Sequence, residues 1–100
     1  MSQWIYFIHP PRTGFMATIT DDEREIFGRH AGYLADLHAA GTLILAGPTL
    51  GDVNTGIHVF DAPDEAAARA LMDADPAIAS GLCRGELRPI RVSFLRGQDG

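Results

Sequence analysis

The sequence predicts an α+β domain in which one four-stranded antiparallel sheet carries two helices on one of its faces. Apolar, β-branched segments alternate with two helical segments in the order β-α-β-β-α-β. The second and third strands are joined by residues 49–55, a link too short for a crossover helix, so these strands should form a hairpin. With right-handed crossovers elsewhere, this order gives a ferredoxin-like arrangement. The 100 residues are expected to form a single domain, residues 1–100.

The first strand is expected at Gln3–His9, which is rich in aromatic and β-branched residues. Strand alternation divides its side chains between the two faces of the sheet. Trp4, Tyr6 and Ile8 share one face, and Ile5, Phe7 and His9 share the other. Both faces are largely apolar, whereas the helices cover only one. A second subunit is therefore expected to cover the other face, giving a homodimer or a larger oligomer.

The first helix is expected at Asp21–Ala40, after a loop over residues 10–19. Thr20 and Glu23 have the spacing of a capping box, and the acidic first turn suits the positive end of the helix dipole. Gly41 can end the helix, because glycine adopts a positive φ without the steric cost of a Cβ atom.

The second strand is expected at Thr42–Ala46, and Gly47-Pro48 should end it because proline has no N–H to donate. The third strand is expected at Gly56–Phe60. The last strand, at about Glu86–Leu95, should lie at one edge of the sheet, since it contains Pro89.

The second helix is expected to begin within Asp61–Glu65 and to end before Asp75-Pro76, because the residue before proline disfavours helical backbone. Ala77–Gly81 can form one more helical turn. These segments complete the predicted fold.

Composition excludes several classes of function. The net charge of −5 argues against a nucleic-acid partner, which requires a basic surface. No apolar run approaches the roughly 20 residues that span a bilayer, and no basic amphipathic helix suggests membrane binding. The N-terminal residues predict no secretory signal, and the single Cys83 fits a reducing cytoplasm, so a cytoplasmic location is expected.

His30 is the best-placed ionisable residue of the chain. It shares one face of the first helix with Ile26, Tyr33 and Leu37, at steps of three and four residues. A histidine on an apolar face is either a buried residue whose ring nitrogens are satisfied by neighbours or a general base, because histidine titrates near neutral pH. The sequence leaves both interpretations open.

Asp75 is the natural partner for His30. Pro76 holds its backbone extended, so the carboxylate can point along the sheet edge; the alternative is an ordinary Asp-Pro turn. A carboxylate bonded to an imidazole fixes the tautomer of the ring. His9 and His58 could join these two residues around a metal, but the spacings match no known ligand pattern. We therefore expect no metal and no other cofactor.

An ordered set of segments resembles the YCII-related (YciI-like) family. The segments are H-x-x-Y-L-x-x-L-x-x-x-G-x-L-x-x-A-G-P at His30–Pro48, then Gly56, an acidic Ala-rich helix at Asp64–Met72, and D-A-D-P-A-I-A-S-G at Asp73–Gly81. The likeness extends from Trp4 to Phe94. It implies a dimeric α+β barrel of ferredoxin-like subunits whose proposed active-site dyad corresponds to His30 and Asp75. Relatives that share the barrel resemble muconolactone-isomerase-like and dehydrochlorinase-like enzymes that act on small cyclic compounds.

The resemblance and the residues together suggest a small-molecule lyase or isomerase. His30 would transfer a proton and Asp75 would orient it. The candidates for the substrate pocket are Tyr6, Phe7, His9, Phe15, Tyr33, Pro48 and His58. The alternative is a non-catalytic ligand-binding or accessory module, in which His30 and Asp75 are structural partners. A third interpretation is a purely structural oligomer.

Overall fold

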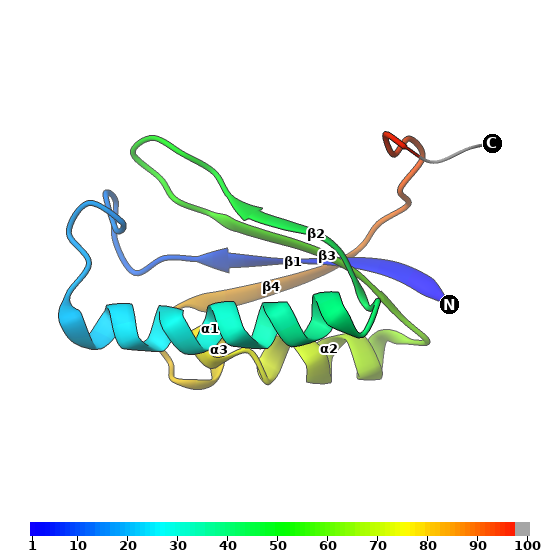
Figure 1. Ribbon diagram of the computed structural model, residues 1–100, viewed down its shortest axis with the longest axis horizontal. Helices are drawn as coiled ribbons and strands as arrows, with labels where there is room; N and C mark the ends of the chain where they lie inside the picture. The colour runs from blue at the N-terminus through cyan, green and yellow to red at the C-terminus, as the bar shows by residue number, and fades with distance from the viewer. Residues whose placement is uncertain (98–100) are drawn as a thin grey trace.

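A computed structural model describes residues 1–97, in which three helices pack against one face of a four-stranded sheet (Figure 1). The strands are β1 (Ser2–His9), β2 (Leu43–Pro48), β3 (Gly56–Ala62) and β4 (Arg84–Pro89). The helices are α1 (Asp21–Ala39), α2 (Glu65–Asp73) and α3 (Pro76–Ala79). The last three residues of the predicted domain lie outside the described residues. No helix within residues 1–97 has the length and apolar character needed to cross a bilayer.

The sheet has the strand order β2-β3-β1-β4, and every neighbouring pair is antiparallel. This topology confirms the predicted ferredoxin-like α+β fold, including the hairpin of β2 and β3. The two central strands, β1 and β3, are in a register that places Tyr6 opposite His58. This pairing brings together two residues that are 52 positions apart in the sequence, and it is central to the site described below.

Helix α1 begins at Asp21, as its sequence predicts, and ends at Ala39, one residue before the predicted end. The Thr20 side chain accepts a hydrogen bond from the Glu23 amide, and the Glu23 carboxylate accepts one from the Thr20 amide, which completes the capping box. At the other end Gly41 has φ = 78°, and the amide of Thr42 returns to the carbonyl of Leu37. The caps fix both ends of the helix that carries His30.

The edge strands differ from prediction. Strand β2 continues through Pro48, which its position at the edge of the sheet tolerates. Strand β4 begins two residues earlier than predicted and ends at Pro89, so the predicted strand over residues 90–95 is wrong. Past Pro89, the amide of Val92 bonds to the side-chain oxygen of Gln3 at 2.8 Å instead of to a strand carbonyl. That side-chain bond takes the donor a longer ladder would need.

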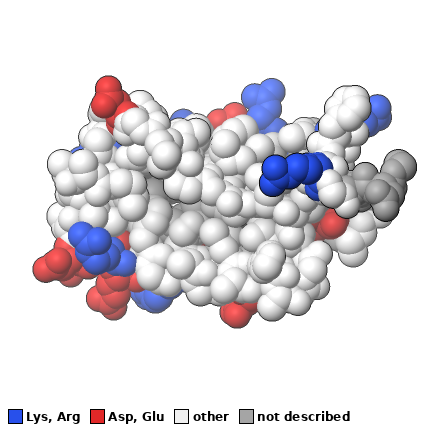
Figure 2. Space-filling view, turned by 45° about the horizontal axis from the view of Figure 1, so that its top comes forward, with Lys and Arg blue, Asp and Glu red and all other residues white. Residues whose placement is uncertain are grey.

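The core lies between the sheet and the helices. Strand β1 contributes Trp4, Tyr6 and Ile8, and the helices contribute Ala68, Met72 and Ala77. The alternate side chains of β1, Ile5 and Phe7, face away from the helices and stay half-buried. The face brought forward in Figure 2 has an uncharged centre, with charged side chains mainly towards its edges.

Candidate functional site

Asp75 is fully buried at the point where α3 begins. Its backbone is extended (φ −62°, ψ 125°), as expected before Pro76, and its Oδ1 atom accepts a hydrogen bond from the amide of Ala77 at 2.9 Å. The hydroxyl of Tyr6 donates to Oδ2 at 2.7 Å. The cap of a short helix thus directs a carboxylate into the core instead of into solvent.

His30 completes the set of hydrogen-bond donors around this carboxylate. Its Nδ1 atom lies 2.8 Å from both oxygens of Asp75. Burial disfavours ionisation of Asp75, but the hydrogen bonds from His30 and Tyr6 outweigh it and hold the pKa of this carboxyl below its ordinary value. Because the ionised carboxylate can only accept, Nδ1 of His30 carries the proton, and Nε2 is left as the free nitrogen.

A second imidazole, that of His58, packs beside the pair. The ring of His58 stacks on that of Tyr6 with centroids 4.2 Å apart, and its edge meets His30 at 5.4 Å and 86°. Nδ1 of His58 donates to the backbone carbonyl of Tyr6 at 3.0 Å, since a carbonyl can only accept. Burial lowers the pKa of His58 to about 4, and the bond to Tyr6 offsets this only in part. His58 is therefore neutral at pH 7.

A cavity of about 340 Å³ lies between α1 and the adjoining ends of β1, β2 and β3. Its lining is mostly apolar and comprises Ile8, Pro10, Phe15, Met16, Phe27, His30, Ala31, Leu34, Ala46, Gly47, Pro48, Asn54, Gly56 and His58. Asp75 does not line the cavity and contacts it only through His30. The volume is at the small end of the range for ligand pockets.

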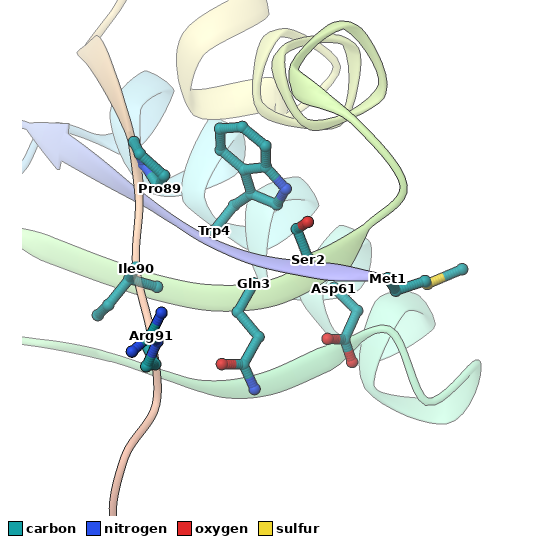
Figure 3. A pocket seen from close by; sticks show the side chains of 8 residues that line it. All are labelled: Met1, Ser2, Gln3, Trp4, Asp61, Pro89, Ile90 and Arg91. Carbon is teal, nitrogen blue, oxygen red and sulfur yellow. The ribbon is translucent and has the colours of Figure 1, made fainter.

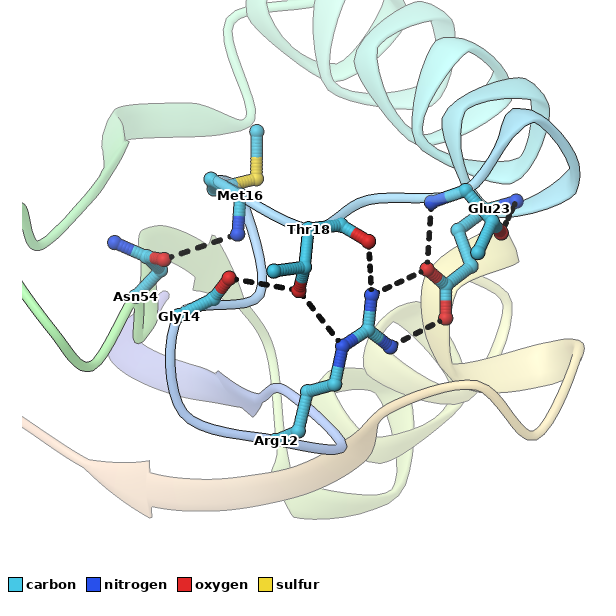
Figure 4. A network of polar contacts seen from close by, with 7 residues as sticks. Arg12, Gly14, Met16, Thr18, Glu23 and Asn54 are labelled. Atoms are coloured by element: carbon cyan, nitrogen blue, oxygen red, sulfur yellow. Dashed lines mark hydrogen bonds and ion pairs between the residues drawn. The ribbon is translucent and has the colours of Figure 1, made fainter.

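The loop before α1 contributes Phe15 to this cavity, and Arg12 holds the loop in place (Figure 4). The Arg12 guanidinium donates to both oxygens of Glu23 at 2.8 Å and to the carbonyl of Thr18 at 2.7 Å. The bonds from Arg12 and the helix cap lower the pKa of Glu23 to about 2. Arg12 also lies over the ring of Phe15, 5.0 Å from its centroid.

The structure brings together part of the predicted set of site residues. Phe15, His30, Pro48 and His58 line the cavity. Tyr6 does not line it, but its ring stacks on His58 and its hydroxyl donates to Asp75.

Besides Tyr6, three more predicted pocket residues do not line the cavity. Phe7 and His9 do not line the cavity, because strand alternation directs them to the opposite face, where His9 pairs with Glu86 at 2.8 Å. Tyr33 donates to the carbonyl of Leu71 at 2.6 Å and joins α1 to α2.

Of the four candidate metal ligands, His9, His30, His58 and Asp75, all but His9 lie close together. His30, His58 and Asp75 each offer a ligand atom, and these atoms lie within 4.8 Å of one another. Both oxygens of Asp75 and the Nδ1 atoms of His30 and His58 already make hydrogen bonds. Unless these buried bonds break, only the two Nε2 atoms are available as metal ligands. Catalytic zinc sites use three protein ligands. The arrangement suits proton transfer better than metal binding.

A second hollow, of about 780 Å³, is an open groove where the start of β1 meets the segment after β4 (Figure 3). Gln3, Asp61 and Arg91 are directed to one side of the sheet there, while the Trp4 ring is directed to the helical side. The groove contains no histidine. The cavity beside His30 and His58 is therefore the candidate site.

The buried His58 makes stability depend on pH. Its pKa is about 4 in the folded chain against 6.5 ordinarily, so the unfolded chain binds more protons between these values and stability falls on acidification through this window. Acidification from pH 7 to pH 4 should lower the free energy of unfolding of wild type by about 3 kcal/mol more than it lowers that of His58→Gln. Urea titrations across this range measure the difference. Equal pH slopes for the two proteins would contradict it.

Comparisons with known proteins agree with this fold. A family model described as YCII-related domain matches residues 6–91. A solved structure of 5-chloro-2-hydroxyhydroquinone dehydrochlorinase (TftG) from Burkholderia phenoliruptrix AC1100, in complex with 2,5-dihydroxybenzoquinone, is similar with a TM-score of 0.65. The two chains are 19% identical, and the alignment covers 96% of this chain and 99% of that one. At this identity the likeness shows the fold. No curated protein sequence matches.

Proposed function

Since this chain belongs to the YCII-related family, we propose that it is a small-molecule lyase or isomerase in which His30 and Asp75 carry out proton transfer. The observation that carries this proposal is the hydrogen-bonded pair beside the apolar cavity. His30 lines the cavity, and its Nδ1 atom lies 2.8 Å from both oxygens of the buried Asp75. The free Nε2 atom of His30 is the basic group that a ligand can reach.

The proposed step is abstraction of a proton from the substrate by Nε2 of His30. The resulting imidazolium is stabilised by Asp75, which stays ionised and keeps the ring in one orientation. In an isomerase the same nitrogen returns the proton to another atom of the substrate. In a lyase the electron pair left behind expels a leaving group instead. A positioned acid–base group of this kind supplies about 10²–10⁴ in rate, which suits an activated substrate.

The proposed substrates are small and cyclic. The similar dehydrochlorinase is named for its action on 5-chloro-2-hydroxyhydroquinone, and its structure holds 2,5-dihydroxybenzoquinone. A cavity of about 340 Å³ with aromatic and aliphatic walls suits a single ring. The likeness in fold and the size of the cavity support this class of compound for the present chain.

A panel of small cyclic lactones, enones and halogenated hydroxy-aromatics tests the proposal. Each compound is incubated with the protein in D₂O and followed by ¹H NMR. We expect at least one compound to be converted, with the loss of a leaving group or with deuterium incorporated at the carbon from which the proton is removed. If the whole panel is recovered unchanged and unlabelled, the enzymatic proposal is wrong.

A non-catalytic binding module is the second candidate. It is favoured by the structural contacts of Asp75, which caps α3 and joins it to β1 through Tyr6 and to α1 through His30. In this case compounds would bind in the cavity without conversion. The same NMR samples distinguish the two, because binding shifts or broadens ligand signals without producing new ones.

We also propose that the chain forms a homodimer through the open face of the sheet. Ile5 and Phe7 on that face are half-buried in the single chain, and helices cover only the opposite face. Sedimentation equilibrium should give a mass of about twice 10.8 kDa. Phe7→Glu is expected to shift that mass towards one chain. A single-chain mass for the unchanged protein would contradict the proposal.

A further inference from the structure

We propose that His58 is a second ligand-binding residue of this cavity. The ligand would donate one hydrogen bond to His58 and another to His30. The ligand is accordingly a small neutral compound with two hydrogen-bond donors on an apolar ring. This inference rests on the proposed function for the position of the ligand, and it deepens that proposal by naming the chemical features that the site selects.

The Nε2 atom of His58 is open to the cavity. Nδ1 is occupied by the carbonyl of Tyr6, and no protein group within residues 1–97 bonds to Nε2. Over the same residues, Trp4 Nε1 is the only side-chain N or O atom that is both enclosed and without a partner. Nε2 of His58 is therefore not enclosed by protein, although the side chain as a whole is buried. Because His58 lines the cavity, its free nitrogen faces the ligand volume.

Gly56 makes room for this ring. A Cβ atom at position 56 would lie 2.9 Å from Cε1 of His58 and 3.3 Å from Cβ of Ile8, closer than side chains normally approach. Gly56 itself lines the cavity, so its missing side chain leaves space on the side where the ring is exposed. A glycine at this point of β3 weakens the strand, and the close approach of the imidazole explains its presence.

The lining of the cavity determines the charge of the ligand. It includes no Lys, Arg, Asp or Glu, and Asp75 is covered by its own hydrogen-bond donors. An anionic or cationic ligand would be desolvated there without a counter-charge, which is costly. His30 and His58 instead both present acceptor nitrogens, so a neutral compound with two donors fits best.

The separation of the two rings constrains the positions of the donors. The centroids of His30 and His58 are 5.4 Å apart and the rings are nearly perpendicular, at 86°. Rings this close favour two donors on neighbouring or alternate atoms of one small ring over donors that lie farther apart. Diols with this spacing are the class of ligand that we infer.

Binding of resorcinol, 3-methoxyphenol and 1,3-dimethoxybenzene, measured by calorimetry with EDTA present, tests this inference. We expect resorcinol to bind wild type about tenfold more tightly than its monomethyl ether, since the ether leaves one buried acceptor without a donor. His58→Asn keeps an N–H for the carbonyl of Tyr6 but has no acceptor at the position of Nε2. The preference for resorcinol over its monomethyl ether should therefore fall below about twofold. His58→Gln can place an oxygen near the position of Nε2 and should keep most of the preference.

Gly56→Ala provides an independent variant, because it displaces the His58 ring without removing it, and it should also lower the ratio. It replaces His58→Asn in the comparison if that protein does not fold. The inference is overturned if wild type shows no preference for resorcinol, if the preference survives in the folded His58→Asn or Gly56→Ala protein, or if binding needs added Zn²⁺. A preference that depends on His58, together with an unconverted substrate panel, would support this inference while rejecting the enzymatic proposal.

Discussion

Replacement of His30 by alanine is expected to lower kcat by two to four orders of magnitude on any substrate that the protein converts. His30 provides the free Nε2 atom in the cavity, and its other nitrogen is held by Asp75 at 2.8 Å. The truncation removes the proposed proton acceptor and leaves the carboxylate without one of its donors. Initial rates at saturating substrate measure the effect, and circular dichroism shows whether the fold is retained.

Two further variants separate chemistry from structure. His30→Asn can still donate an N–H to Asp75 but has no outer nitrogen, so it should be as inactive as His30→Ala while being more stable. His38→Ala removes an exposed histidine from the same helix and should leave kcat unchanged. Activity of His30→Asn within threefold of wild type would show that His30 is not the base.

Local sequence signals account for most of the fold. The capping box at Thr20 and Glu23 and the glycine stop at Gly41 are written in consecutive residues, and both ends of α1 follow them closely. The C-terminal strand was less predictable. Its apolar alternation continues past Pro89, but the Val92 amide donates to the side-chain oxygen of Gln3, and no local sequence pattern predicts this competing acceptor.

The candidate site depends on contacts between distant segments. The Asp75-Pro76 dipeptide and the face of α1 indicate that His30 and Asp75 can meet, and the family resemblance implies the same. Their catalytic role stays a prediction. The position of His58 in the site follows from the register of β1 and β3, which places it opposite Tyr6 and which neither strand specifies alone. Strand alternation alone is enough to exclude Phe7 from the cavity, because it places Phe7 on the opposite face of β1 from Tyr6 and Ile8, which face the helices.

Replacement of Asp75 by alanine should reduce the free energy of unfolding by about 3–5 kcal/mol at pH 7, because buried hydrogen-bond donors left without a partner cost about 1–3 kcal/mol each and a lost helix cap costs about 1 kcal/mol more. The side chain is fully buried and accepts from the Tyr6 hydroxyl, the Ala77 amide and His30. Its loss leaves the first two donors enclosed and takes away the cap of α3. For a domain of this size the melting temperature should fall by roughly 12 °C or more.

The matched control is Asp73→Ala, which removes an exposed carboxylate two residues away and should change stability by less than about 0.5 kcal/mol. Asp75→Asn keeps an oxygen for the Ala77 amide but brings an NH₂ group against Tyr6 or His30, so its loss of stability should lie between those of Asp73→Ala and Asp75→Ala.

The stabilising contribution of Asp75 depends on pH, because folding lowers the pKa of this carboxyl. The contribution is complete above the ordinary carboxyl pKa of 3.8 and is lost as the pH falls through the lower folded value. Urea titrations at pH 7 measure all three variants, and a loss below 1 kcal/mol for Asp75→Ala would show that water replaces the carboxylate, so that this group does not hold α3 to the sheet.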